Sequence, residues 1–295
     1  MEQILKSYLE YICGKENVAE NVALSTKTTI KIGGPARWFV TVPTKEALMR
    51  LISTLKYIEQ PWFIIGAGAN ILASDKGYNG VVIKLGFKDI IDNGCFVYAD
   101  AGASLKMVCN FARENSLSGL EFASGIPGTV GGAVFMNAGA FGGQVSDVVA
   151  MVDALIDGEV RTVDTRQLNF KYRSSVFQKK DWIILGAYFF LKTCIDKAEI
   201  TSKENAFLTQ RIKTQPALPS AGSVFKRPAI GKIIDELGLK GTQIGGARIS
   251  DLHAGFIVNT GGATCGDVMK LIRLVRKKVK NERGISLQTE IKMLN

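Results

Sequence analysis

The pattern of apolar and polar residues along the first part of the chain predicts alternating helices and strands. Residues 1–22 have the spacing of a short amphipathic helix, and residues 29–42 are typical of a strand, a glycine turn and a second strand. Thr44 is a suitable helix N-cap, because its hydroxyl can accept hydrogen bonds from N–H groups of the first turn. Apolar residues follow it at helical spacing: Leu48, Leu51, Ile52 and Leu55. Residues 61–70 then have the form of a buried strand that runs into glycines.

The middle of the chain continues in the same way. Residues 81–85 and 95–102 are typical of strands, and a helix is expected from Ser104 to Asn115. Two more strands are expected near 148–156 and 182–191. This mixture of strands and helices predicts an α+β fold.

The character of the sequence changes near residue 200. Residues 198–213 are polar with helical spacing, and the prolines of residues 215–223 interrupt them. We therefore expect a domain boundary near 200–215. The remaining elements are expected as helices near 231–238 and 265–282 and as strands near 254–258 and 287–292.

The composition is that of a folded globular protein. Of the 295 residues, 46% are apolar and 22% are charged, which argues against a disordered or coiled-coil chain. The 37 Lys and Arg outnumber the 27 Asp and Glu by ten, so the surface attracts anions such as nucleic acid, acidic lipid or phosphorylated small molecules. The densest basic stretch, Arg273 to Lys280, alternates with apolar residues and is typical of a solvated helix face.

Cysteine and histidine exclude several classes of protein. The cysteines are odd in number, far apart and without a C-x-x-C pair, which argues for reduced thiols in a cytoplasmic protein. They are Cys13, Cys95, Cys109, Cys194 and Cys265. The single histidine, His253, excludes a histidine-rich metal centre, so we expect no metal, and its apolar neighbours favour a structural role. The longest apolar run, residues 182–191, is half the length of a membrane span, so no membrane association is expected.

The first glycine cluster lies in residues 64–75, with the sequence IIGAGANILASD. Glycines allow the backbone to approach a ligand closely, so that successive N–H groups can converge on a phosphate. Gly66 and Gly68 match the first two glycines of a dinucleotide-binding fingerprint, but Ile71 stands at the third position, and no P-loop follows. A tight structural turn remains an equal interpretation of this segment.

The second glycine cluster, residues 123–143, contains seven glycines among 21 residues. A flexible loop is the simplest interpretation, but embedded apolar residues such as Val130 and Val134 argue against it. Thr129 adds a hydroxyl donor. Two such clusters in one domain suggest a long anionic ligand, such as a dinucleotide, held by backbone N–H groups.

Three further residues are candidates for chemistry. Arg173 lies among aromatic residues in FKYRSSVFQ, where its planar guanidinium suits a carboxylate, although an internal ion pair is an alternative. Ser223 follows small residues in PSAGSVFKRP, with cations beside it, and a turn serine is the alternative. Glu290 is a carboxylate among alternating residues near the C-terminus, a pattern that also fits an exposed strand.

Together these stretches resemble the UDP-N-acetylenolpyruvoylglucosamine reductase (MurB) family of bacterial flavoenzymes. The resemblance runs from about Thr28 to Glu290, with the motifs in the family's order. They are GAGAN-I-L-x-S-D, SGIPGTVGGAVxMNAGA, YRSSVF, AGSVFK, IDELGLKGxxIGGARIS and HAGFIVNxGxAT. Little separates YRSSVF from the strand at 182–191, so the chain is similar to the family's shorter second type.

The resemblance implies an FAD-binding fold of the vanillyl-alcohol oxidase type, followed by a smaller α+β substrate-binding domain. The expected parts are an N-terminal helical segment at 1–30, an FAD-binding domain at 31–200 and a substrate-binding domain at 201–295. The implied cofactor is FAD and the implied co-substrate is NADPH. The implied reaction reduces UDP-N-acetylglucosamine enolpyruvate to UDP-N-acetylmuramate for peptidoglycan synthesis. We expect a cytoplasmic monomer without a nucleic-acid or membrane partner.

The same resemblance implies roles for individual residues. Arg173, Ser223 and Glu290 match the family's three catalytic positions. Both glycine clusters are expected to bind FAD, through Gly66, Ala67, Gly68, Ala69, Asn70, Ile71, Ser124, Gly125, Pro127, Gly128, Thr129, Gly132 and Ala133. Candidates for contacts to the UDP-sugar or to nicotinamide phosphates are Tyr172, Lys226, Arg227, Lys240 and Asn259. Arg227 stands where the family pattern often has Asn.

Two other classes of protein fit parts of the sequence. A different FAD oxidoreductase of the same fold, oxidising a sugar or alcohol, explains the glycine clusters but gives Ser223 and Glu290 no joint role. A non-enzymatic nucleotide- or nucleic-acid-binding protein could instead use the basic helix near 273–280. Salt-sensitive DNA binding by a colourless protein would favour that class.

Overall fold

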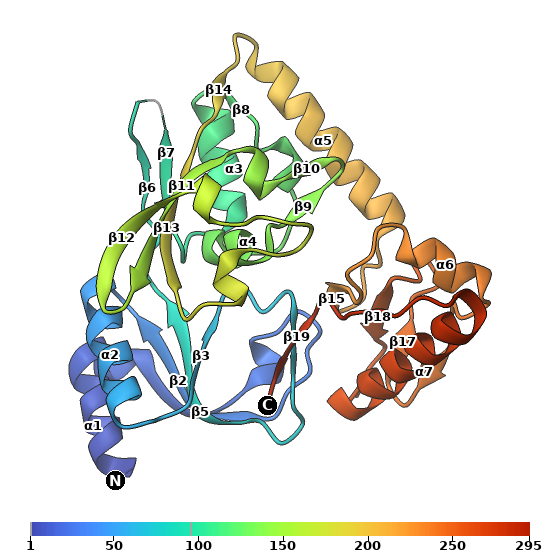
Figure 1. Cartoon of the computed structure of the whole chain (residues 1–295), viewed down its shortest axis with the longest axis horizontal. Coiled ribbons are helices and arrows are strands. Elements are labelled where there is room, and N and C mark those ends of the chain that lie inside the picture. The colour runs from blue at the N-terminus through green and yellow to red at the C-terminus, as the bar shows by residue number, and fades with distance from the viewer. Residues whose placement is uncertain (1, 95) are drawn as a thin grey trace. The chain divides into compact units, whose positions relative to one another are not determined.

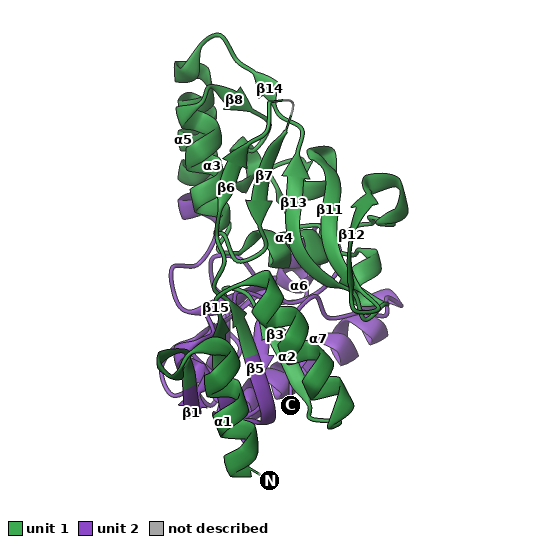
Figure 2. Cartoon of the chain, turned by 90° about the vertical axis from the view of Figure 1, so that its left-hand side faces the viewer, with its two compact units in different colours: residues 1–18, 40–67, 83–211 green, residues 19–39, 68–82, 212–295 purple. Residues whose placement is uncertain are grey.

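The chain divides into two units, each built from several separate segments (Figure 2). The structure, a computed structural model, describes every residue except Met1 and Cys95. Unit 1 comprises residues 1–18, 40–67 and 83–211. Unit 2 comprises residues 19–39, 68–82 and 212–295. The continuous domains expected at 1–30, 31–200 and 201–295 stay a prediction.

A five-stranded antiparallel sheet forms the centre of unit 1 (Figure 1). Its strand order is β12-β11-β13-β7-β6. The strands are β6 (Ile90–Asp92), β7 (Val97–Asp100), β11 (Val149–Ile156), β12 (Glu159–Asp164) and β13 (Ile183–Phe189). β13 is almost entirely buried and five of the eight residues of β11 are buried, as expected of central strands, and α4 (Val130–Met136) packs on β13.

Two further helices of unit 1 begin at side-chain caps that the sequence provides. The Thr44 and Ser104 hydroxyls accept from the N–H groups of Ala47 and Met107, and so begin α2 (Lys45–Tyr57) and α3 (Leu105–Glu114). The expected caps and apolar faces of these two helices are therefore confirmed. Two short antiparallel strand pairs complete the unit. They are β8 (Leu117–Ser118) with β14 (Lys192–Thr193), and β9 (Gly139–Ala140) with β10 (Gly143–Gln144).

The N-terminal expectations were partly wrong. The first helix, α1 (Glu2–Cys13), stops well before residue 22, because the Asn17 side-chain amide binds the Cys13 carbonyl and ends the helix there. The residues that follow, which include the β-branched Val18 and Val22, form β1 (Val18–Ala23) instead.

No strand forms at residues 29–34, because the Thr28 hydroxyl bonds to both the N–H and the carbonyl of Ile32 and closes a local loop. The strand expected after this loop does form, as β2 (Pro35–Val42). It belongs to a sheet of order β1-β2-β5-β3, with β3 (Trp62–Ile65) and β5 (Tyr78–Leu85). The division between the units falls inside β2 and β5.

Unit 2 is built on a four-stranded antiparallel sheet with the order β15-β18-β17-β16. The strands are β15 (Ser220–Ser223), β16 (Gln243–Ile244), β17 (Ala247–Ile249) and β18 (Phe256–Asn259). The helices are α6 (Ile230–Glu236) and α7 (Cys265–Arg283). β19 (Lys292–Leu294) pairs in parallel with β4 (Ile71–Ala73). The C-terminal strand expected near 287–292 therefore begins later and is shorter than predicted.

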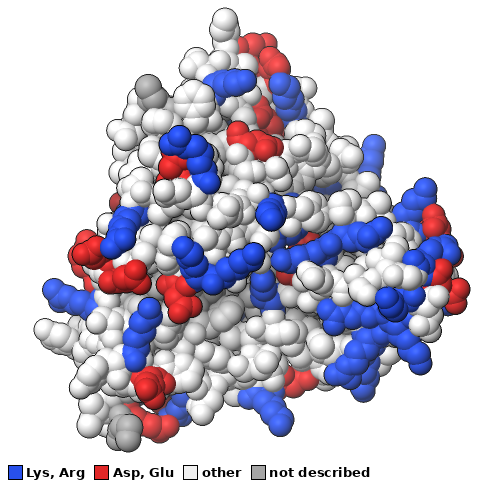
Figure 3. Space-filling model, viewed as in Figure 1, with Lys and Arg blue, Asp and Glu red and all other residues white. Residues whose placement is uncertain are grey.

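Helix α7 has one apolar and one basic face. Its buried residues pack with those of the sheet into one core: Val268, Leu271, Ile272, Val275 and Val279. The intervening cations Arg273, Lys277, Lys278 and Lys280 are exposed, and Figure 3 shows Lys and Arg gathering on the surface where α7 lies. The expected solvated helix face is confirmed.

Helix α5 (Lys197–Thr214) is the long polar helix that the sequence predicted before the proline-rich stretch. Its residues up to Arg211 belong to unit 1. In the described part of the chain, no helix is both long and apolar enough to cross a membrane.

Candidate cofactor and substrate site

The first glycine-rich segment is held by tight backbone packing around Gly68. This residue is buried and has φ of +66°, a conformation that favours glycine. A Cβ atom at this position would lie 2.1 Å from the carbonyl oxygen of Lys27. Close backbone packing, and not only a ligand, therefore requires glycine here.

The backbone of this segment has a consistent orientation. The carbonyls of Gly68 and Asn70 accept from the N–H groups of Thr29 and Lys292, at 3.2 and 2.9 Å. Because a trans peptide is planar, the next N–H groups, of Ala69 and Ile71, point away from these donors. Such an arrangement turns N–H donors outward, as a phosphate-bearing cofactor requires.

The second glycine-rich segment is held by side chains and backbone together. Thr129 is the N-cap of α4, where its hydroxyl accepts from the N–H of Gly132 at 3.3 Å. The carbonyl of Gly128 accepts from the N–H of Leu105 at 2.9 Å, so the N–H of Thr129 points away from Leu105. A Cβ at Gly128 would meet its nearest atom, on Leu105, only at 3.6 Å. The backbone is therefore open enough there for close approach by a ligand.

The two glycine-rich segments approach each other at one point within unit 1. A Cβ at Gly66 would lie 2.7 Å from the Oγ1 of Thr129. A side chain at position 66 would thus displace the cap of α4. The residues fit a phosphate-bearing cofactor, because small side chains and outward N–H groups come from both segments.

Arg173 is held in a fixed orientation by unit 1. Its backbone has φ of +53°, and the side chain of Gln178 donates to its carbonyl at 3.1 Å. The guanidinium donates to the carbonyls of Asn137 and Gly139 and lies over the ring of Tyr172. Neither carbonyl carries a formal charge, so these two bonds orient the guanidinium without neutralising it. The arrangement suits a group that stabilises negative charge.

Asn137 organises this arrangement, and the sequence analysis did not single it out. It is 1% exposed, has left-handed backbone, and caps the end of α4. Its amide donates to the carbonyl of Lys171 at 3.1 Å and accepts from the N–H of Ser146 at 2.9 Å. A buried asparagine in an otherwise small-residue stretch is a signal that could have drawn attention to it.

Unit 2 brings Ser223 and Glu290 onto neighbouring segments of the chain. The N–H of Glu290 donates to the carbonyl of Val224, next to Ser223, at 2.7 Å. On the other side, the amide of Asn70 donates to the carbonyl of Glu290 at 3.2 Å. Both Ser223 and Glu290 are half-buried. One glycine-rich segment and two catalytic candidates are therefore linked by hydrogen bonds.

Two lysines lie close together near this pair. The pKa of Lys292 is lowered by burial of its ammonium group and, to a smaller extent, by the charge of Lys226. The backbone N–H of Lys226 donates to the carbonyl of Gln288, which keeps it beside the segment that leads to Glu290. The sequence analysis named Lys226 as a candidate but did not name Lys292. The structure reveals Lys292, because its ammonium group lies close enough to Lys226 for that charge to affect its pKa.

The other substrate candidates differ in what they contact. Arg227 is exposed, whereas Lys240 forms an ion pair of 2.7 Å with Asp235. The amide of Asn259 is buried, donates to the carbonyl of Ile30 and accepts from the N–H of Gly261. Asn259 therefore ties backbone segments together, while Arg227 is accessible from solvent.

His253 packs as a structural residue in unit 2. Its Nδ1 accepts from the N–H of Gly255 at 3.0 Å, and its ring packs edge-on against Phe256. Burial lowers its pKa, so the neutral form is favoured. These contacts agree with the structural role that its apolar neighbours favoured.

The cysteines and acidic residues that the structure describes bear on disulfide formation and metal binding. Cys13, Cys109, Cys194 and Cys265 are free, and Cys95 lies outside the described residues. In the part of the chain that the structure describes, no three His, Cys, Asp or Glu side chains gather to hold a metal ion.

Two family models match separate parts of the chain. The model of an FAD-binding domain matches residues 36–164. The model of the UDP-N-acetylenolpyruvoylglucosamine reductase C-terminal domain matches residues 210–294. The expected α+β class, an FAD-binding domain followed by a smaller C-terminal domain, is confirmed. The class of protein is therefore that of the FAD-dependent oxidoreductases.

Relatives with high similarity over the full chain define the family. A UDP-N-acetylenolpyruvoylglucosamine reductase of Pseudothermotoga lettingae is 46% identical over 92% of this chain and 95% of its own. The reductase of Caldanaerobacter subterraneus is 42% identical over 100% of this chain and 99% of its own. The crystal structure of the Thermus caldophilus enzyme superposes with a TM-score of 0.81 at 36% identity, covering 93% of this chain and 98% of its own. The chain belongs to the UDP-N-acetylenolpyruvoylglucosamine reductase family, which acts in peptidoglycan synthesis.

Proposed function

We propose that this flavoenzyme uses NADPH to reduce UDP-N-acetylglucosamine enolpyruvate to UDP-N-acetylmuramate. The observation that supports the proposal most is the pairing of Ser223 and Glu290 on adjacent segments of unit 2, in a chain with an FAD-binding domain. A proton donor and a carboxyl group are what this reduction needs besides a hydride source. The enzyme is proposed to act as a monomer in the cytoplasm, where free thiols such as those described persist.

The chemistry divides between the cofactor and the chain. When bound, FAD accepts hydride from NADPH and delivers it to the methylene carbon of the enolpyruvyl group. In the proposal, residues 66–71 and 124–133 hold FAD through outward N–H groups and small side chains.

Arg173 is proposed to stabilise the negative charge that develops on the substrate carboxylate. Its permanent charge and fixed orientation make this stabilisation available without rearrangement. Glu290 in its protonated form donates a hydrogen bond to the same oxygens.

Ser223 is proposed to donate the proton that completes the reduction. A serine hydroxyl is a weak acid, so it suits a strongly basic enolate carbon. Burial chiefly lowers the pKa of Lys292, and the charge of Lys226 lowers it further. The positive charge of Lys226 would stabilise the serine oxygen as its proton leaves. Lys226 and Arg227, together with Tyr172, Lys240 and Asn259, stay candidates for binding the anionic substrates.

An anaerobic visible absorption spectrum tests the proposal directly. We expect a flavin band that bleaches with NADPH and returns when UDP-N-acetylglucosamine enolpyruvate is added. A band that bleaches but does not return would support an NADPH-dependent oxidoreductase but exclude UDP-N-acetylglucosamine enolpyruvate as its substrate. Oxygen-dependent turnover of a sugar or alcohol would instead favour the other flavoenzyme class, and failure to bind FAD would favour a nucleotide- or nucleic-acid-binding role.

Substitution of Ser223 tests the proton-donor assignment. Ser223→Ala should slow substrate reduction by about 10²–10⁴-fold, the usual contribution of general acid catalysis, while NADPH still bleaches the flavin at the normal rate. Stopped-flow absorbance measures both half-reactions separately. Ser286→Ala, an exposed serine on the segment before Glu290, is the matched control and should leave both rates unchanged. Equal slowing of both half-reactions by Ser223→Ala would reject the role.

A further inference from the structure

One face of helix α5 lies against both ends of the second glycine-rich segment. Glu204, Phe207, Leu208 and Arg211 recur at the spacing that places residues on one side of a helix. All four belong to unit 1, as does the glycine-rich segment. Apart from the buried Ile200, one turn before Glu204, the helix is mostly polar and exposed, so this side is where it is anchored.

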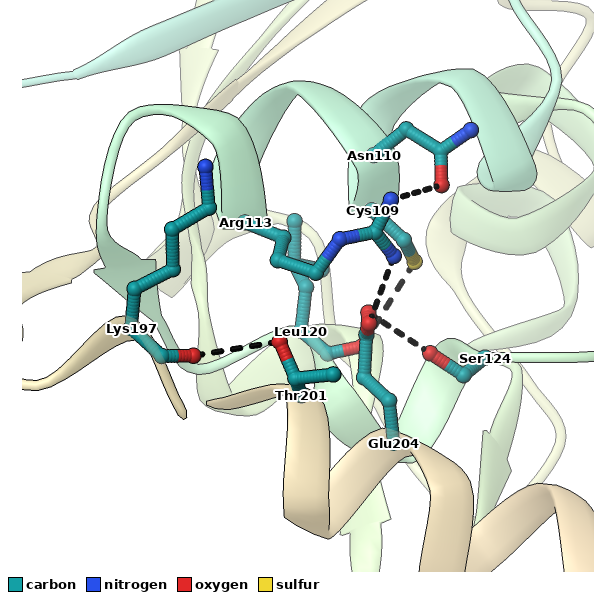
Figure 4. Close-up of polar contacts among 8 residues, drawn as sticks. All are labelled: Cys109, Asn110, Arg113, Leu120, Ser124, Lys197, Thr201 and Glu204. Atoms are coloured by element: carbon teal, nitrogen blue, oxygen red, sulfur yellow. Dashed lines mark hydrogen bonds and ion pairs between the residues drawn. The ribbon is translucent and has the colours of Figure 1, made fainter. Parts of the chain in front are cut away.

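Glu204 is the buried centre of this face. Its side chain points from α5 toward Arg113 on α3 and Ser124 at the start of the glycine-rich segment (Figure 4). One carboxylate oxygen accepts from Arg113 at 2.8 Å, and the other accepts from the Ser124 hydroxyl at 2.9 Å. Glu204 is 4% exposed. A carboxylate is costly to bury unless it is paired, so these two contacts hold it in one geometry.

The surrounding groups respond to the charge of Glu204. Its hydrogen bond raises the pKa of Arg113, which is already a strong base. Burial, and then the charge of Glu204, raise the pKa of the Cys109 thiol to about 12. Arg113 also donates to the side-chain oxygen of Asn110 at 3.0 Å, so its guanidinium is held on both sides.

The next two turns of α5 extend the contact. A Cβ on Gly125 would lie 2.8 Å from Leu208 and 3.1 Å from Arg211. Phe207 stacks on Phe141 near the far end of the glycine-rich segment, and Arg211 lies over the same Phe141 ring. The helix thus contacts residues 124–125 and residue 141, on either side of the Gly128–Thr129 backbone.

We propose that Glu204 is a positioning residue for FAD binding. By accepting from Ser124 while paired with Arg113, it fixes the start of the glycine-rich segment, and with it the Gly125–Thr129 turn, in the conformation that binds the phosphate-bearing cofactor. This inference rests on the proposed assignment of residues 124–133 to FAD. It adds a residue 80 positions away in the chain, on a helix outside the matched FAD-binding domain.

The substitution Glu204→Gln separates the charge from the shape. A carboxamide has one oxygen, and the charged guanidinium of Arg113 competes best for it. The amide nitrogen then faces Ser124, whose hydroxyl can only accept from it, so a hydrogen bond to a charged carboxylate is replaced by a neutral one. The variant therefore keeps the volume of the side chain but weakens the contact that fixes Ser124.

The test measures how fast FAD leaves the full-length holoenzyme. Flavin fluorescence after dilution reports dissociation, and titration of the stripped chain with FAD reports the equilibrium constant. We expect Glu204→Gln to raise the dissociation constant by about 10-fold or more, since hydrogen bonds to charged groups are among the stronger ones. Glu199→Gln is the matched control, because Glu199 lies on the same helix but is exposed and forms an ion pair with Lys203. Its FAD binding should match that of the unmodified chain.

A double-substitution cycle distinguishes positioning from general stability. Ser124→Ala alone should weaken FAD binding by about 3- to 10-fold and should fold even if Glu204→Gln does not, because it leaves the Glu204–Arg113 pair intact. In the Glu204→Gln background it should add less than it does alone, since the contact is already weakened.

Two outcomes would overturn the inference while leaving the proposed function standing. One is an unmodified chain that binds FAD and a Glu204→Gln variant that binds it equally well, even if that variant melts at a lower temperature. The other is full additivity of the two substitutions. An unmodified chain that does not bind FAD at all would instead reject the proposed function.

Discussion

The two glycine-rich segments have similar compositions, yet different groups hold them in place. Around Gly68 the backbone itself does so, through a close approach to Lys27 and carbonyl contacts to Thr29 and Lys292. In the segment from 123 to 143, side-chain hydrogen bonds contribute as well: Thr129 caps α4, and Ser124 donates to Glu204. The first segment is therefore held mainly by backbone contacts, and the second is held by side-chain contacts as well.

This difference explains why composition alone was ambiguous. A tight structural turn and a ligand-binding loop were both reasonable interpretations of residues 64–75. The structure shows that packing requires glycine at position 68, while ligand binding by the neighbouring residues stays a prediction. At Gly128, by contrast, packing does not require glycine, since a Cβ would meet only an ordinary contact.

The largest expected effect is that of Gly68→Ala. The left-handed backbone and the close approach to Lys27 together should cost about 2–5 kcal/mol of unfolding free energy. Chemical denaturation measures the loss. Gly238→Ala is the matched control, because Gly238 has φ of +69° in the same unit with no atom within 4 Å of its Cβ position. It should cost only about 1–2 kcal/mol. Equal losses would mean that backbone packing does not define position 68.

Gly128→Ala should have the opposite effects: little loss of stability but a clear loss of FAD affinity. The folded chain accommodates the methyl group, so the unfolding free energy of the FAD-free chain should stay within about 0.5 kcal/mol. FAD affinity should fall by about 10-fold or more, because the methyl group keeps the cofactor from approaching the backbone. Fluorescence titration with FAD measures it. Gly266→Ala, whose Cβ would also meet ordinary contacts but in α7, should leave FAD affinity unchanged. Unaltered FAD binding by Gly128→Ala would exclude close approach at this residue.

The smallest expected effect is that of Thr129→Val, which removes the cap of α4 and keeps the volume. Loss of an N-cap costs about 1 kcal/mol, which corresponds to a melting temperature lower by roughly 2–4 °C. Circular dichroism during heating measures it. Thr193→Val, at an exposed strand position, serves as the reference and should change little. A melting temperature equal to that of the reference would show that the Thr129 hydroxyl does not stabilise the second segment.

Most of the regular structure could be predicted from local sequence. Thr44 and Ser104 began helices as expected, and the buried strands β11 and β13 followed from continuous apolar runs. The errors came where a side chain bonded to nearby backbone. Asn17 ended α1 early, and Thr28 closed a loop in place of a strand. Such local competition leaves no periodic signal in the sequence.

The candidate site was predictable only in part, because its residues are remote in the chain. Ser223 and Glu290 were named from motifs, but their adjacency depends on a hydrogen bond between Val224 and Glu290. Glu204 had no signal of its own, since a glutamate on a polar helix is usually exposed. Its burial follows from partners 80 and 91 positions away.

The sequence by itself determined the class of protein, the order of the elements and the motifs that mark the family. These depend on periodicity, caps and short patterns, which are properties of neighbouring residues. Only the tertiary structure decided which glycines are required by packing, which polar groups are buried, and that Lys292 joins Lys226 beside the Ser223 segment. Burial and proximity arise when distant segments pack together, and therefore no local pattern encodes them.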